Sequence, residues 1–137
     1  MAGALLEGPS AARPVTQRHQ ILIVAETQAL ASKLRGWLNA SGYWTTVVGS
    51  YAAAKFHLEM QPSMAIAELR LGEYNGLQLA VRATSNHVPV LVVGERDRFF
   101  EHEAEQLGAA YLAVDELDSA RIVACVEDQI AHAHAHF

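Results

Sequence analysis

The sequence predicts an α/β fold of the doubly wound type, with helices on both faces of a five-stranded parallel sheet. Short runs of β-branched and aliphatic residues recur five times, and a segment with helical spacing of apolar residues follows each run. The first run, QILIV at 20–24, is apolar without alternation, as is typical of a strand buried on both faces. Repeated β/α alternation of this kind predicts right-handed crossovers that place helices on both sides of the sheet.

The elements can be assigned in order along the chain. Thr27 is a candidate N-cap for the first helix, which Gly42 ends, and Ser50 is a candidate cap for the second, which stops before Pro62. A loop is expected at 72–76 before the third helix, which begins at Leu77. The remaining strands are predicted at 43–48, 64–69, 88–93 and 110–114, and the last two helices at 97–107 and 116–132.

Composition limits the functional classes. At 137 residues the chain has room for one domain, expected at 19–131 between a flexible tail at 1–18 and a His/Ala tail at 132–137. A net charge of −5 and ten scattered basic residues argue against nucleic-acid binding. A lone cysteine, Cys125, permits no intramolecular disulfide, and no apolar run is long enough to cross a membrane. We therefore expect a cytoplasmic protein with no membrane partner.

Chemistry in such sheets gathers at the carboxyl ends of the strands. Glu26 follows the first strand and Glu68 ends the third, so these two carboxylates could face each other. The fourth strand is followed by Gly94 and the fifth by Asp115. No G-x-G-x-x-G follows the first strand, which excludes the usual dinucleotide site.

Four segments together resemble the CheY-like receiver domains of response regulators, over about residues 19–130. The resemblance implies a flavodoxin-like sheet of strand order 2-1-3-4-5, made by a non-enzymatic signalling domain. The segments that carry it are ILIV at 21–24 running into an acidic position, ELRL at 68–71 with NGL at 75–77, VPVLV at 88–92, and LGAAYL at 107–112.

The resemblance also implies a site with several altered positions. The acidic pair that helps to hold Mg²⁺ is reduced to Glu26, because Ala25 precedes it, and the phosphoacceptor aspartate is replaced by Glu68. The hydroxyl position falls on Gly94, or on Val93 if the gap is moved by one residue. The lysine position falls on Asp115, or on Val114 if it is counted from Tyr111, and neither placement supplies a cation. We therefore expect no cofactor, with at most weak Mg²⁺ binding at Glu26 and Glu68. Tyr111 occupies the position of a switching aromatic, and a packed, static ring is expected there.

The functional prediction is an atypical receiver, or pseudo-receiver, that signals by protein–protein contact without ordinary aspartyl phosphorylation. Its partner would be a histidine kinase or another signalling protein, which would bind one particular face of the domain. A homodimer could also form through that face. Phe99 and Phe100 mark that face, made by residues 97–107, 110–114 and 116–132, and one of the two rings is expected to face solvent. The alternatives are a phosphorelay acceptor that uses Glu68 or a non-standard site, and a small-molecule-binding flavodoxin-like module.

Two interpretations of Glu68 stay open: a carboxylate that mimics a bound phosphoryl group, or a solvated residue at a loop mouth. Arginines could fold over the site and pair with Glu26 and Glu68 in place of the lost lysine. Trp37 and Trp44 are expected in or near the core. The arginines in question are Arg70, Arg96 and Arg98.

Overall fold

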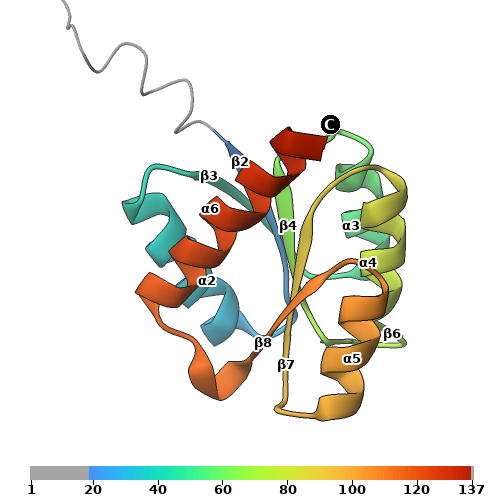
Figure 1. Ribbon diagram of the computed structural model, residues 1–137. Helices are drawn as coiled ribbons and strands as arrows, with labels where there is room; N and C mark the ends of the chain where they lie inside the picture. The colour runs from blue at the N-terminus through green and yellow to red at the C-terminus, as the bar shows by residue number, and fades with distance from the viewer. Residues whose placement is uncertain (1–18, 137) are drawn as a thin grey trace, which may run out of the picture.

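The computed structural model describes residues 19–136, with the side chains of residues 134–136 left out of the description. Five parallel strands form one sheet in the order β3-β2-β4-β7-β8, which confirms the predicted order (Figure 1). The predicted tail at 1–18 lies outside the described residues. The strands are β2 (Gln20–Val24), β3 (Trp44–Val48), β4 (Met64–Glu68), β7 (Val90–Gly94) and β8 (Ala110–Ala113).

Helices cover both faces of the sheet, as predicted. On one face α2 and α6 pack over Ile21, Ile23 and Ile66, and on the other α3, α4 and α5 pack over Leu22 and Val92. All five of these strand residues are at most 1% exposed, because neighbouring side chains of a parallel strand enter opposite halves of the core. The helices are α2 (Gln28–Ala40), α3 (Tyr51–Leu58), α4 (Gly76–Ser85), α5 (Arg98–Gln106) and α6 (Ser119–His136).

Side-chain caps set several helix starts. Ser50 accepts a hydrogen bond from the Ala53 amide at 3.2 Å and begins α3, as the sequence predicts. Asn75 and Gln78 form a reciprocal capping box at the start of α4. Thr27 is the N-cap residue of α2, as predicted, but its side chain makes no capping hydrogen bond.

The predicted loop at 72–76 is instead partly a hairpin. Strands β5 (Arg70–Leu71) and β6 (Tyr74–Asn75) pair in antiparallel register across a turn at Gly72, whose φ is +62°. The glycine makes this tight reversal possible because positive φ carries no side-chain penalty there. The ring of Tyr74 stacks on Tyr51 of α3 with centroids 4.4 Å apart, so the hairpin is anchored to the helical layer.

The final helix differs from the prediction at both ends. A 3₁₀ turn at Val114–Glu116 follows β8, so α6 begins at Ser119 and not at 116. The Asp118 carboxylate accepts from the Arg121 amide at 2.7 Å and supplies the cap. The helix continues to His136, so residues 132–136 extend it and do not leave it as a separate tail. None of the helices within 19–136 is long and apolar enough to cross a membrane.

The two tryptophans differ in burial. Trp37 packs against the core layer of α2 and α6, as expected. Trp44 is 54% exposed, so its predicted place in the core is wrong. The reason is topological: Trp44 begins β3, which is an edge strand of the sheet, and the sequence alone does not say which strand lies at an edge.

Candidate functional site

Glu68 lies at the carboxyl end of β4, and its carboxylate is held by the loop after β2. The Oε1 atom accepts from the amides of Glu26 at 2.9 Å and Thr27 at 3.1 Å. The Oε2 atom accepts from the Thr27 hydroxyl at 2.6 Å. Hydrogen bonds to an ionised acceptor are stronger than neutral ones, so Glu68 ties β4 to the neighbouring loop. The Glu68 carboxylate is thus held in a fixed position by three donors while it stays partly exposed.

Glu26 joins this cluster through its backbone. Its side chain is directed to the hairpin, where Oε2 lies 3.0 Å from the place that a Cβ of residue 72 would take. Gly72 therefore leaves room for the Glu26 carboxylate. The structure brings Glu26 and Glu68 together, as predicted, but by an amide-to-carboxylate bond and not as two facing carboxylates.

Gly94 ends β7 in a space that other side chains fill. A Cβ added here would lie 2.7 Å from both Leu69 Cβ and the Tyr111 hydroxyl oxygen. Real Cβ atoms do not approach other atoms so closely, and Leu69 belongs to the packed core. A serine or threonine at this position would therefore require Leu69 and Tyr111 to move.

Tyr111 in β8 crosses over Gly94 and donates a 2.6 Å hydrogen bond to the Glu95 carbonyl oxygen. Its ring is half-buried and packs against the core layer under α3, α4 and α5. Burial raises the pKa of the Tyr111 hydroxyl to about 12, and the negative charges of Glu95, Glu101 and Asp97 add to the shift. The side chain is packed, as predicted.

A small cavity of about 170 Å³ lies between these groups. Its wall is largely apolar, and its charged members are two glutamates and one arginine. The cavity therefore lacks the convergent cationic groups that would stabilise a phosphoryl group. The lining residues are Leu30, Glu68, Leu69, Arg70, Val93, Gly94, Glu95 and Val114.

Comparisons with known proteins agree with this geometry at the level of fold. No protein-family model and no curated protein sequence matches the chain. Among solved structures, a putative response regulator from Chloroflexus aurantiacus superposes with a TM-score of 0.76 and 23% identity, over 83% of this chain and 98% of the other. The signal receiver domain of a modulated diguanylate cyclase from Desulfovibrio desulfuricans superposes with a TM-score of 0.77 and 21% identity, over 88% and 99%.

The chain has the receiver fold. A third neighbour shares it, the receiver domain of a sensor histidine kinase from Pseudomonas aeruginosa, described with a magnesium ion coordinated in its active site cleft. That domain superposes with a TM-score of 0.73 and 20% identity, over 83% of this chain and 98% of its own. The magnesium ion makes the corresponding edge of the present receiver fold worth testing for the same chemistry.

The residues at this edge of the receiver fold do not fit Mg²⁺. The ion demands near-octahedral oxygen ligands, usually with carboxylates among them. Ala25 offers a buried methyl group, and both Glu68 oxygens already accept hydrogen bonds from Glu26 and Thr27. Among the side chains that the structure describes, residues 19–133, no three from His, Cys, Asp or Glu cluster in a way that could hold a metal ion.

The arginines near the site pair with carboxylates other than the predicted ones. Arg70 contacts Glu95 at 2.6 Å, and Arg96 contacts Asp115 at 3.1 Å and Glu116 at 3.0 Å. The expectation that Arg70 and Arg96 pair with Glu26 and Glu68 is therefore wrong. The physical reason is proximity, because both arginines lie beside the acidic groups that follow β7 and β8. The pairs are exposed, so solvent screens them and they contribute little to stability.

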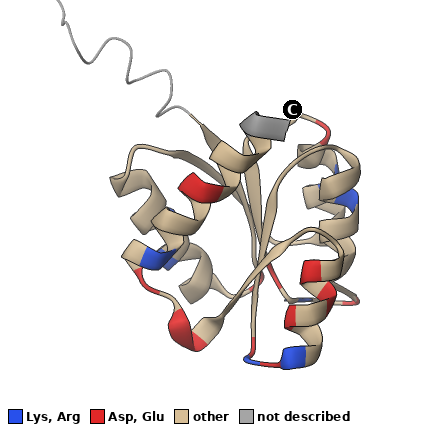
Figure 2. Ribbon diagram, viewed as in Figure 1, with Lys and Arg blue, Asp and Glu red and all other residues tan. Residues whose placement is uncertain are grey.

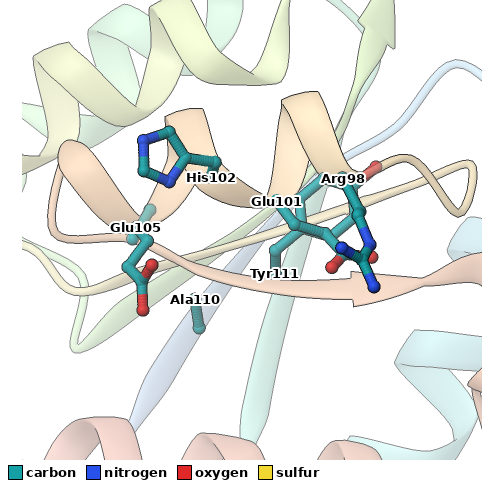
Figure 3. A pocket seen from close by; sticks show the side chains of 7 residues that line it. Arg98, Glu101, His102, Glu105, Ala110 and Tyr111 are labelled. Carbon is teal, nitrogen blue, oxygen red and sulfur yellow. The ribbon is translucent and has the colours of Figure 1, made fainter.

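Arg98 lines a different hollow, a groove between α5 and β8. Figure 3 shows Arg98, Glu101 and Tyr111 at one end of the groove and His102 and Glu105 at the other. The groove measures about 550 Å³, and the red segments of α5 in Figure 2 mark several acidic residues along this helix.

The two phenylalanines of α5 point in different directions, as predicted. Phe99 is 64% exposed, whereas Phe100 packs against the core. Phe99 therefore marks the solvent-facing surface of the helix.

Sequence reasoning missed two contributors to the site, Thr27 and Leu69. Thr27 was assigned to helix capping, and its hydroxyl instead binds Glu68. The sequence predicts Leu69 only as a strand residue, yet its side chain fills the space over Gly94. No local sequence signal reports either contact, because each partner lies on a different strand or loop.

Proposed function

We propose that this chain is a pseudo-receiver, a signalling domain of receiver fold that acts by protein–protein contact without phosphorylation at its acceptor position. The observation that carries the proposal is the set of three hydrogen bonds that Glu68 accepts from Glu26 and Thr27. A phosphoacceptor needs a carboxylate oxygen free to attack in line, and both Glu68 oxygens are engaged.

The length of the Glu68 side chain and the charges around it support the same conclusion. A glutamate places its carboxylate roughly 1 Å farther along than an aspartate, and misplacement of that size costs on the order of 100-fold in rate. Asp115 stands at the lysine position and binds Arg96, so no cation there faces Glu68. Transfer to Glu68 would lack both positioning and charge neutralisation.

Phosphorylation is tested by intact-mass measurement after incubation with acetyl phosphate and Mg²⁺. The wild-type chain, Glu68→Asp and Glu68→Gln are compared, with an ordinary aspartate-bearing receiver domain as the positive control. We expect no added phosphoryl group on wild type, and none on Glu68→Asp because Gly94 and Asp115 remain.

Two other outcomes have defined meanings. Magnesium-dependent modification of wild type that disappears in Glu68→Gln would make the chain a phosphorelay acceptor. A small molecule retained through purification and seen by native mass spectrometry would favour the flavodoxin-like binding module.

The expected partner is a protein, either a histidine kinase or another signalling protein, and the α5 face offers its contact surface. Phe99 is exposed on α5 and follows Arg98, which lines the groove that Figure 3 shows. Exposed aromatic side chains often anchor interfaces. Pull-down with Phe99→Glu should lose the partner, whereas Val81→Glu, at an exposed position of α4, should keep it. Equal recovery with both variants would remove α5 from the proposal.

A further inference from the structure

The part of the chain that the structure describes places no strand along the outer edge of β3. Among residues 19–136, β2 is the only neighbour of β3 in the sheet. Trp44 donates to His19 and Val48 accepts from Ala25, so these residues turn their backbone toward β2. Because the direction alternates along a parallel strand, Thr45 and Val47 turn their amides and carbonyls outward.

The edge lacks the usual devices that prevent strand addition. Natural edge strands often carry charges, proline or bulges for this purpose. Here the strand is WTTVV, and no charged residue occurs between Arg35 and Lys55. Trp44 and Val47 are 54% and 37% exposed, so apolar side chains flank the open backbone groups on both faces of the sheet.

The neighbouring helix leaves this edge accessible. A hollow of about 310 Å³ lies beside Thr46 on the α3 side of the strand. His57 and Met60 form its far wall, and Met60 is itself exposed. Approach to the strand from this face is therefore not blocked by a packed helix.

We infer that a second copy of this chain pairs with β3 in antiparallel fashion about a two-fold axis at Thr46. Thr45 of each copy would then lie opposite Val47 of the other and exchange hydrogen bonds with it, which gives four bonds across the interface. Trp44 would face Val48 of the other copy. Aromatic and β-branched residues are a favourable cross-strand pair.

Charge favours a second copy at this edge over the α5 face. The chain carries a net charge of −5, so two copies repel unless they meet at a neutral surface. The β3 edge is neutral, whereas α5 presents Glu101, Glu103 and Glu105. Self-association therefore uses β3, and the α5 face stays available to a different protein.

Sedimentation equilibrium over a concentration series tests the dimer. We expect wild type to dimerise and Val47→Lys to remain monomeric, because the lysine puts a charge at the edge of each copy. Val81→Lys is the matched control at an exposed position of α4, and it should dimerise like wild type. Circular dichroism verifies that each variant is folded.

Cysteine cross-linking tests the register without relying on Val47. In a Cys125→Ala background, Thr46→Cys places two thiols opposite each other at the axis and should form a disulfide-linked dimer. Thr45→Cys in the same background should form far less, because its opposite residue is Val47.

Three results would overturn the inference: a chain that stays monomeric up to about 1 mM, a dimer that Val47→Lys leaves intact, or a dimer lost in Phe99→Glu.

Discussion

The Thr27 hydroxyl donates a 2.6 Å hydrogen bond to Oε2 of Glu68, across 41 positions of sequence. Through this bond and the two amide bonds to Oε1, the residue at the acceptor position joins β4 to the loop that begins α2. The carboxylate is thus a structural acceptor. The proposed function assigns to the same three bonds the inability of Glu68 to act as a nucleophile.

Removal of the Thr27 hydroxyl should destabilise the fold. Thr27→Val should lower the free energy of unfolding by about 1 kcal/mol, and Glu68→Ala by about 2 kcal/mol because three donors lose their acceptor. Thr45→Val is the matched control, since its hydroxyl makes an exposed, neutral bond to Asn39. Urea denaturation measures all three, and equal effects of the two threonine variants would contradict a special role for Thr27.

Restoring a hydroxyl at the position of Gly94 should be costly. Gly94→Thr should lower the free energy of unfolding by about 1–3 kcal/mol, because its Cβ would overlap Leu69 and Tyr111. Gly36→Ala in α2 is the contrasting control, since a Cβ there meets nothing within 4 Å. Alanine is the better helix former, so that variant should gain about 0.5–1 kcal/mol. Thermal or urea unfolding measures whether Gly94→Thr loses stability and Gly36→Ala gains it, as expected.

Tyr111 should make the free energy of unfolding fall as the pH becomes alkaline. The pKa of its hydroxyl is raised from 10.0 to about 12 in the folded chain. Between these two pH values the folded chain therefore keeps the hydroxyl proton that the unfolded chain releases. The contribution to the free energy of unfolding is fully present below pH 10 and is lost as pH rises toward 12. Tyr111→Phe should remove this part of the dependence.

Ultraviolet titration of tyrosinate absorbance checks the assignment directly. The difference between wild type and Tyr111→Phe isolates one hydroxyl among the four tyrosines. A difference curve with its midpoint near pH 10 would contradict the raised pKa.

Cys125 should react slowly with thiol reagents. Burial in α6 raises its pKa from 9.0 to about 11, and the charge of Asp128 adds to the shift. The thiolate fraction at neutral pH should therefore be roughly a hundredfold below that of a free cysteine. Labelling with a disulfide reagent at pH 8, with urea-unfolded chain as the control, measures the difference. Equal rates in the two states would refute it.

Much of the fold could be predicted because its central strands are buried on both faces. A run such as 21–24 has few stable alternatives to a core strand, and caps such as Ser50 act within one helical turn. The hairpin at Arg70–Asn75 and the exposure of Trp44 were missed. Both depend on which elements become neighbours, and apolar periodicity does not report that.

The sequence by itself determined the five β/α units and which residues, Glu68, Gly94 and Asp115, lie at or just after the ends of three strands, because patterning and residue identity are local properties. Only the tertiary structure decided that Glu68 accepts a hydrogen bond from Thr27 and that Leu69 and Tyr111 fill the space at Gly94. It also decided that Arg96 forms an ion pair with Asp115. Hydrogen bonds and close packing act over a few ångströms, so they depend on which distant segments folding brings side by side.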